Sequence, residues 1–137
     1  MIAMRHGRAT QAGAADRAIW LAAALAGLAA LSYVLIGLGI LGVGDLAASE
    51  RPAGIVFAAA GGYLLGGLLI LARRRWLWIV GAAINALVIL VFLLGYQDRP
   101  AVLFSAGGLA SKAAEILLEA VLLSLILTGV HRARRPV

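Results

Sequence analysis

Residues 52–96 read PAGIVFAAAGGYLLGGLLILARRRWLWIVGAAINALVILVFLLGY. This stretch contains two apolar runs, residues 52–72 and 76–96, and three consecutive arginines at 73–75 are all that separates them. Each run has about the 20 residues that an α-helix needs to cross the hydrocarbon core of a bilayer. Neither run contains a charged residue. The stretch therefore predicts two transmembrane helices joined by a tight basic turn.

Two further apolar runs, residues 17–43 and 108–130, flank this pair. The 137-residue chain is 64% hydrophobic and 13% charged, whereas an ordinary soluble domain is about 25% charged. A chain so short and so apolar cannot cover itself with polar side chains, so its main partner is the lipid bilayer. We expect an all-α polytopic membrane protein, with a four-transmembrane-helix bundle over residues 17–130.

The segments outside the apolar runs predict tails and a helix break. Residues 1–16 are small, polar and basic, which is typical of a mobile cytoplasmic tail. Residues 131–137 are expected to form a second, basic cytoplasmic tail. A helix running without interruption from residue 101 through the fourth span would be about 45 Å long, more than the bilayer core needs. We expect Gly107 and Gly108 to break it.

Basic residues are distributed unevenly along this topology. Cytoplasmic loops carry the excess of Lys and Arg in membrane proteins. The side that holds both termini and the 73–75 turn is therefore cytoplasmic, and the same rule explains the net charge of +6 without nucleic acid as a partner. The composition, rich in Arg, Ala and Gly, favours a bacterial plasma (inner) membrane. Nine arginines lie on the cytoplasmic side and three basic residues opposite: Arg5, Arg8, Arg17, Arg73, Arg74, Arg75, Arg132, Arg134 and Arg135 against Arg51, Arg99 and Lys112.

Four polar residues stand out from the apolar background of the spans: Tyr63, Asn85, Glu115 and Glu119. Counted from the basic span ends at 1.5 Å per residue, Tyr63, Asn85 and Glu119 lie about 15–19 Å deep, near the middle of the bilayer. A charged residue at that depth costs about 2.5–3.5 kcal/mol on insertion scales. These side chains are therefore expected to face the bundle interior, with Tyr33 close to the depth of Glu115.

Lys112, Glu115 and Glu119 share one helical face, because their spacings are i, i+3 and i+7. We predict an outward-facing acidic cavity that binds or translocates a proton, a cation or a small cationic or amphipathic ligand, as a transporter does. Glu119 would titrate, Glu115 would stand at the entrance, and Asn85 and Tyr63 would orient the ligand. Structural alternatives remain open for each residue. Lys112 and Glu115 suit an ion pair, and Asn85 suits helix packing. Glu119 would be protonated, or hydrogen-bonded to Asn85 or Tyr63.

Small residues in the second span predict a helix-packing face. Ala58, Gly62 and Gly66 follow each other at four-residue spacing, and small residues permit close approach of helices in lipid. We expect this face to pack inside the bundle, with a homodimer as the alternative. Two further functions stay open. The chain would be an accessory subunit of a larger membrane complex, its glutamates paired with a partner's arginines, or a lipid-binding module with an acyl chain between its helices.

Several kinds of chemistry are excluded by residue type. The chain has no cysteine, so disulfides, thiolate metal sites and cysteine nucleophiles are absent. His6 and His131 both lie outside the spans, which excludes a bis-histidine haem between the helices. We therefore expect no metal, no cofactor and no catalytic residue, and an enzyme finds no support beyond the two carboxylates.

Overall fold

A computed structural model describes residues 2–133, with side chains for residue 7 and residues 10–129. Every secondary-structure element in this range is a helix. Among the described residues, three helical segments are long and apolar enough to cross a membrane: Thr10–Gly37 within the first helix, Ala53–Leu71 and Arg75–Tyr96. In chain order the elements are α1 (Ile2–Gly37), the short 3₁₀ helix η1 (Ala48–Glu50), α2 (Ala53–Leu71), α3 (Arg75–Tyr96), α4 (Pro100–Leu103) and α5 (Ala106–Ala133).

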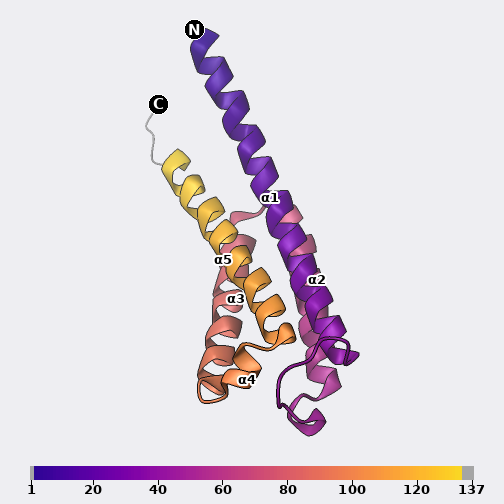
Figure 1. The fold of residues 1–137 in the computed structure, drawn as a ribbon. Helices are drawn as coiled ribbons and strands as arrows, with labels where there is room; N and C mark the ends of the chain where they lie inside the picture. The colour runs from indigo at the N-terminus through magenta and orange to yellow at the C-terminus, as the bar shows by residue number, and fades with distance from the viewer. Residues whose placement is uncertain (1, 134–137) are drawn as a thin grey trace.

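The four long helices run alternately up and down (Figure 1). The start of α1, the α2–α3 turn and the end of α5 lie toward one end of the molecule, and the α1–α2 loop and α4 lie at the other. With 36 residues, α1 is about 54 Å long and extends past the other helices. The sequence predicts four long helical segments, and each corresponds to one of these long helices.

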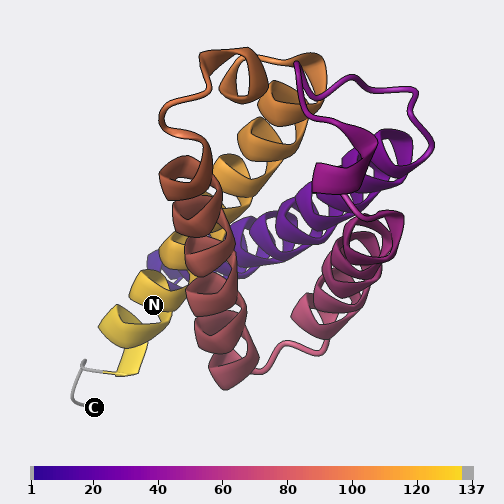
Figure 2. The same ribbon diagram turned by 90° about the horizontal axis from the view of Figure 1, so that it is seen from below.

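The helices pack pairwise. Helix α1 lies along α2 and crosses α5, and α3 packs on α5, whereas α2 and α3 approach each other over a short stretch. Figure 2 shows α2 and α3 apart along most of their length, joined by the α2–α3 turn. The buried core lies between α1 and α5, where alanines of α1 allow a close approach. Its largest contributors are Ile19, Leu25, Ile70, Leu118, Leu122 and Leu125.

Helix α1 differs from the predicted first span at both ends. It begins at Ile2, so residues 2–16 form its first turns and not a separate tail, since Ala and Arg favour helix. It ends at Gly37, six residues before the predicted end at Val43. Gly39 follows the last turn with a positive φ of 73°, a left-handed conformation that ends a helix and that glycine tolerates best. Gly44, further along the loop, also has a positive φ, of 66°.

The break before α5 also differs from the prediction. It falls at Ser105, whose hydroxyl accepts a hydrogen bond from the Gly108 amide at 3.0 Å and so caps the helix. Gly107 instead lets the start of α5 lie close to the α1–α2 loop. Its amide donates to the Gly42 carbonyl at 2.8 Å, and an added Cβ would lie 2.9 Å from that oxygen. Helix α5 continues through Ala133, beyond the predicted span end at 130, and the remainder of the predicted basic tail, residues 134–137, is outside the described residues.

The α2–α3 turn is compressed into residues 72–74. Arg73 takes a positive φ of 58°, unusual for a residue with a side chain. Its guanidinium forms an ion pair with Asp16 of α1. This contact attaches the turn to α1, toward the end of the molecule where α1 begins and α5 ends.

The small-residue face of α2 that packs on α1 is not the predicted one. Gly67 is buried against α1, where an added Cβ would lie 3.2 Å from the Cβ of Ala26. Ala58 and Gly62 are exposed, and Gly66 is half-buried. A Cβ added to Gly62 or Gly66 would meet nothing within 4 Å. The prediction that Ala58, Gly62 and Gly66 pack inside the bundle is therefore wrong. The contact with α1 instead uses the adjacent face of α2, which contains Gly67.

Candidate functional site

Polar side chains from all four long helices meet at one level of the bundle. Helix α1 contributes Tyr33, α2 contributes Tyr63 and α3 contributes Asn85, while α5 contributes three ionisable groups. The predicted residues therefore lie together, and the contacts between them form two hydrogen-bonded clusters. The members from α5 are Lys112, Glu115 and Glu119.

The first cluster surrounds Glu115, which has 0% of its surface exposed. One carboxylate oxygen accepts a hydrogen bond from the Tyr33 hydroxyl at 2.6 Å, and the other pairs with the Lys112 ammonium. Lys112 also donates to the Tyr33 oxygen at 3.1 Å, and its Nζ lies 4.5 Å from the centroid of the Phe92 ring. Both charges are thus neutralised by contacts within the bundle.

The second cluster is organised by Asn85, which is 3% exposed. Its amide oxygen accepts a hydrogen bond from the Tyr63 hydroxyl at 2.8 Å. Its amide nitrogen donates to Glu119 Oε2 at 2.8 Å and to the backbone carbonyl of Glu115 at 2.9 Å. One side chain of α3 therefore connects α2 with α5, which fits the helix-packing role that the sequence left open as an alternative for Asn85.

Aromatic stacking joins the two clusters. The rings of Tyr33 and Tyr63 lie nearly parallel, at 13°, with their centroids 5.6 Å apart. The stacked pair places the hydroxyl groups of α1 and α2 side by side, one directed to Glu115 and the other to Asn85. The result is a continuous polar layer across an otherwise apolar interior.

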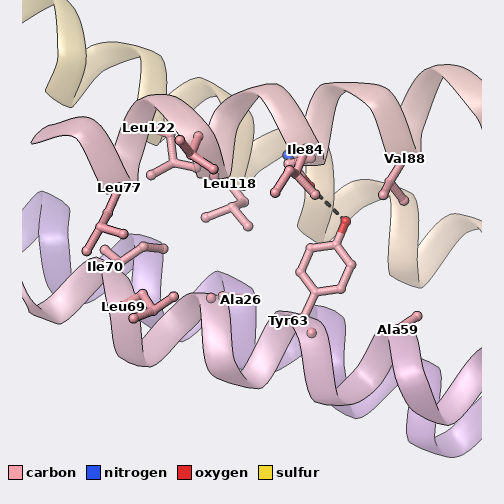
Figure 3. A pocket seen from close by; sticks show the side chains of 15 residues that line it. Ala26, Ala59, Tyr63, Leu69, Ile70, Leu77, Ile84, Val88, Leu118 and Leu122 are labelled. Atoms are coloured by element: carbon pink, nitrogen blue, oxygen red, sulfur yellow. Dashed lines mark hydrogen bonds between the residues drawn. The ribbon is translucent and has the colours of Figure 1, made fainter.

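A groove opens between α2 and α3, on the side where these helices separate. Its cavity volume is about 300 Å³, at the lower end of the 300–1,000 Å³ typical of small-molecule pockets. Figure 3 shows Tyr63 reaching across it from α2 toward α3, with Leu69 and Leu77 toward one end and Ala59 and Val88 toward the other. Tyr63 and Asn85 are its polar members; the apolar ones are Ala26, Ala59, Gly62, Gly66, Leu69, Ile70, Leu77, Val80, Gly81, Ile84, Val88, Leu118 and Leu122.

A smaller cavity of about 130 Å³ lies toward the α1–α2 loop, and we call it the outer cavity. Lys112 and Arg51 line it, together with Tyr33 and aromatic side chains of α3. Neither Glu115 nor Glu119 lines this cavity or the groove. In these two cavities the lining is apolar or includes cations, whereas the predicted outward-facing cavity is acidic. The carboxylates of Glu115 and Glu119 instead make contacts between helices.

Sequence reasoning missed several participants in the site. Tyr33 was expected only near the depth of Glu115, yet it is a direct hydrogen-bond partner of that carboxylate. Phe92 gave no signal, because it is one apolar residue in an apolar helix. Arg51 had been assigned only to the outer surface. Among the residues with described positions, no group of three or more His, Asp or Glu side chains is arranged to hold a metal ion.

An exposed ion-pair network closes the end of the molecule near the outer cavity. Arg99 contacts Glu50 at 2.8 Å and Asp45 at 3.2 Å, so it connects the α3–α4 loop with the α1–α2 loop. The backbone amide of Ala47 donates to Glu50 at 2.9 Å. This amide, and then Arg99, lower the pKa of the Glu50 carboxyl below its ordinary value. The hydrogen bond from Arg99 to Glu50 in turn raises the pKa of Arg99.

Comparison with known proteins adds no relative. No family model matches the chain, and no match was found among curated proteins or among solved structures. The function must therefore be argued from the geometry of the polar layer and the groove.

Proposed function

We propose that the chain is a four-span protein of a bacterial inner membrane, with both termini in the cytoplasm and α5 as the fourth span. Helix α5 has 28 residues, so it is about 42 Å long and reaches across a bilayer. Its Lys112 and Glu115 are buried and paired, and its Glu119 is half-buried and hydrogen-bonded. This shelter from lipid supports α5 as a span despite its ionisable residues.

Single cysteines test this topology directly, because the natural chain has none. Ala48→Cys lies in η1 and Ala72→Cys in the α2–α3 turn, and both positions are exposed. A membrane-impermeant maleimide should label Ala48→Cys on intact bacterial cells and should label Ala72→Cys only after the cells are opened. The reverse pattern, or labelling of both positions on intact cells, would reject the proposed orientation.

Within this membrane protein, the proposed activity is the binding of an amphipathic molecule, whose apolar part lies in the α2–α3 groove. The groove is the observation that carries the proposal. Its walls separate enough to leave about 300 Å³, and its lining is apolar except at Tyr63 and Asn85. Because these two side chains are hydrogen-bonded to each other, the groove offers an apolar ligand no unsatisfied polar group.

The same contacts give less support to the other readings. A cation or proton pathway needs carboxylates facing open space, but Glu115 is fully buried and Glu119 lines neither cavity. An accessory subunit that offers its glutamates to a partner's arginines needs those groups free, whereas Glu115 already pairs with Lys112 and Glu119 accepts from Asn85. An apolar ligand requires neither carboxylates that face open space nor glutamates free to pair with a partner.

A matched pair of glycine substitutions tests the binding proposal. Gly62 lines the groove and Gly61, its neighbour, does not, and an added Cβ would meet nothing within 4 Å at either position. Gly62→Leu should fill the groove without disturbing the bundle, and Gly61→Leu should leave the groove open. The probe is a fatty acid with a diazirine in its acyl chain, photolysed with the purified protein in detergent.

The expected result is labelling of α2 and α3 side chains that line the groove, mapped by peptide mass spectrometry. Gly62→Leu should reduce this labelling several-fold, and Gly61→Leu should leave it at the level of the natural protein. Equal labelling of the two variants would refute the proposal. Far-UV circular dichroism of both variants checks that the helices are retained.

A further inference from the structure

We infer that the occupant of the groove is an anionic phospholipid, with one acyl chain between α2 and α3 and its headgroup phosphate at Arg74. This inference rests on the proposed function and names its ligand. The argument begins from the position of three arginines relative to the groove, since residues 73–75 stand between the helices that form its two walls.

The groove ends about one helical turn from these arginines, none of which lines it. Leu69 and Leu77 line it on opposite walls, and Leu77 follows Arg74 by three residues, about 4.5 Å along a helix. From Leu77 to Val88 the lining of α3 covers 11 residues, or about 16 Å, which is about half the thickness of a hydrocarbon core. An acyl chain that enters beside the arginines thus reaches the level of Tyr63 and Asn85.

The three arginines differ in what they contact. Arg73 pairs with Asp16 of α1. Arg75 lies over α5, where its side chain is 3.7 Å from the position of a Cβ added to Gly129. Arg74 is exposed and forms no ion pair with any carboxylate in the described part of the chain. The middle arginine, in the turn that joins the two walls, is therefore the cation available to a ligand in the groove.

Charge complementarity then selects the ligand. Basic clusters between transmembrane helices on the cytoplasmic side attract anionic headgroups, and each basic residue near such a surface contributes about a fivefold preference. A second copy of the chain fits less well, because a symmetric contact through this face would bring two sets of arginines 73–75 together. Trp76 is 63% exposed beside Arg74, where an amphipathic ring suits the headgroup level.

The test uses the full chain in phosphatidylcholine nanodiscs that contain a small fraction of a photoreactive lipid. Two probes carry the same diazirine acyl chain, one on phosphatidylglycerol and one on phosphatidylcholine. Groove labelling by the phosphatidylglycerol probe should exceed labelling by the phosphatidylcholine probe by about fivefold. Arg74→Gln should bring the ratio close to one, chiefly by lowering phosphatidylglycerol labelling. Arg17 is an exposed arginine of α1, away from the α2–α3 turn, so Arg17→Gln should leave this ratio at about five.

The outcomes separate this inference from the proposed function. Equal labelling by both probes, with Gly62→Leu still reducing it, would overturn the headgroup assignment and leave acyl binding in place. A ratio that Arg17→Gln lowers as much as Arg74→Gln would also overturn it, since the preference would then belong to the whole face. If Gly62→Leu changes neither probe, or if groove residues cross-link to a second copy of the chain, both the inference and the proposed function fail.

Discussion

Removing the charge of Glu115 is the most severe test of the polar layer. Glu115→Gln keeps the size of the side chain and an oxygen that accepts from the Tyr33 hydroxyl. It leaves the Lys112 ammonium, which is 8% exposed, without its carboxylate. The damage should therefore come from an uncompensated buried cation and not from lost packing.

The magnitude follows from the burial of the pair. Breaking a buried ion pair by removing one partner costs about 3–5 kcal/mol. Glu119→Gln is the matched control, because Glu119 is half-buried and accepts a hydrogen bond from Asn85. Glu119→Gln keeps an oxygen that accepts from Asn85, so it should cost no more than the about 0.6–1.7 kcal/mol of a lost hydrogen bond between transmembrane helices. The double variant Lys112→Met with Glu115→Gln carries no buried charge, so it should recover about 2–3 kcal/mol relative to Glu115→Gln.

The assay is unfolding in mixed micelles, with the SDS fraction raised stepwise and helix content followed by circular dichroism. Glu115→Gln should unfold at a clearly lower SDS fraction than Glu119→Gln, and the double variant should lie between Glu115→Gln and the natural protein. The reasoning is refuted if the two single glutamine variants are equally stable. It is refuted equally if the cost of the double variant is the sum of the costs of its two substitutions.

Three further predictions concern packing, backbone conformation and pH. Gly67→Leu should lower stability by about 1–3 kcal/mol in the same unfolding assay, because the new side chain would be forced into α1. Gly61→Leu places its side chain in open space and should cost almost nothing. Equal costs for the two variants would contradict the packing of α2 on α1. Gly44→Ala should lower stability by at least about 1–2 kcal/mol, since the φ of Gly44 is +66° and an added Cβ would overlap the backbone oxygen of Ala101. Unchanged stability would exclude this loop conformation. The lowered pKa of Glu50 stabilises its loop above the ordinary value of 4.5, and that contribution is lost as the pH falls through the lowered pKa. A spin label at Ala48→Cys should therefore become more mobile as the pH falls below 4.5. Glu50→Gln should make the mobility of the label high and independent of pH. A label that stays equally ordered as the pH falls would count against the prediction.

The polar layer was largely accessible from the sequence. A fixed rise per residue placed Tyr63, Asn85 and Glu119 at one depth, and helical spacing put Lys112 on the same face as the glutamates. Depth and face do not determine the partner, however. The sequence offered no means to decide that Tyr33 would bond Glu115, because that choice depends on how α1 is rotated against α5.

The packing face of α2 shows the same limit. The doublets at residues 61–62 and 66–67 give two adjacent small-residue faces, and both satisfy the requirement for close approach. The contact with α1 uses Gly67, so Gly62 and Gly66 are left to line the groove. Helix ends were also uncertain, since α1 ends through the backbone conformation of Gly39 and not through a change in hydropathy.

The pairing of α5 with both α1 and α3 has a consequence for biosynthesis. A ribosome delivers the chain from the N-terminus, so α5 emerges after every helix that contacts it. In the proposed topology, the three apolar segments enter the membrane first and bring the hydroxyls of Tyr33 and Tyr63 and the amide of Asn85 with them. The charged helix then inserts beside ready-made partners, and the span least able to enter lipid alone is the one that never has to.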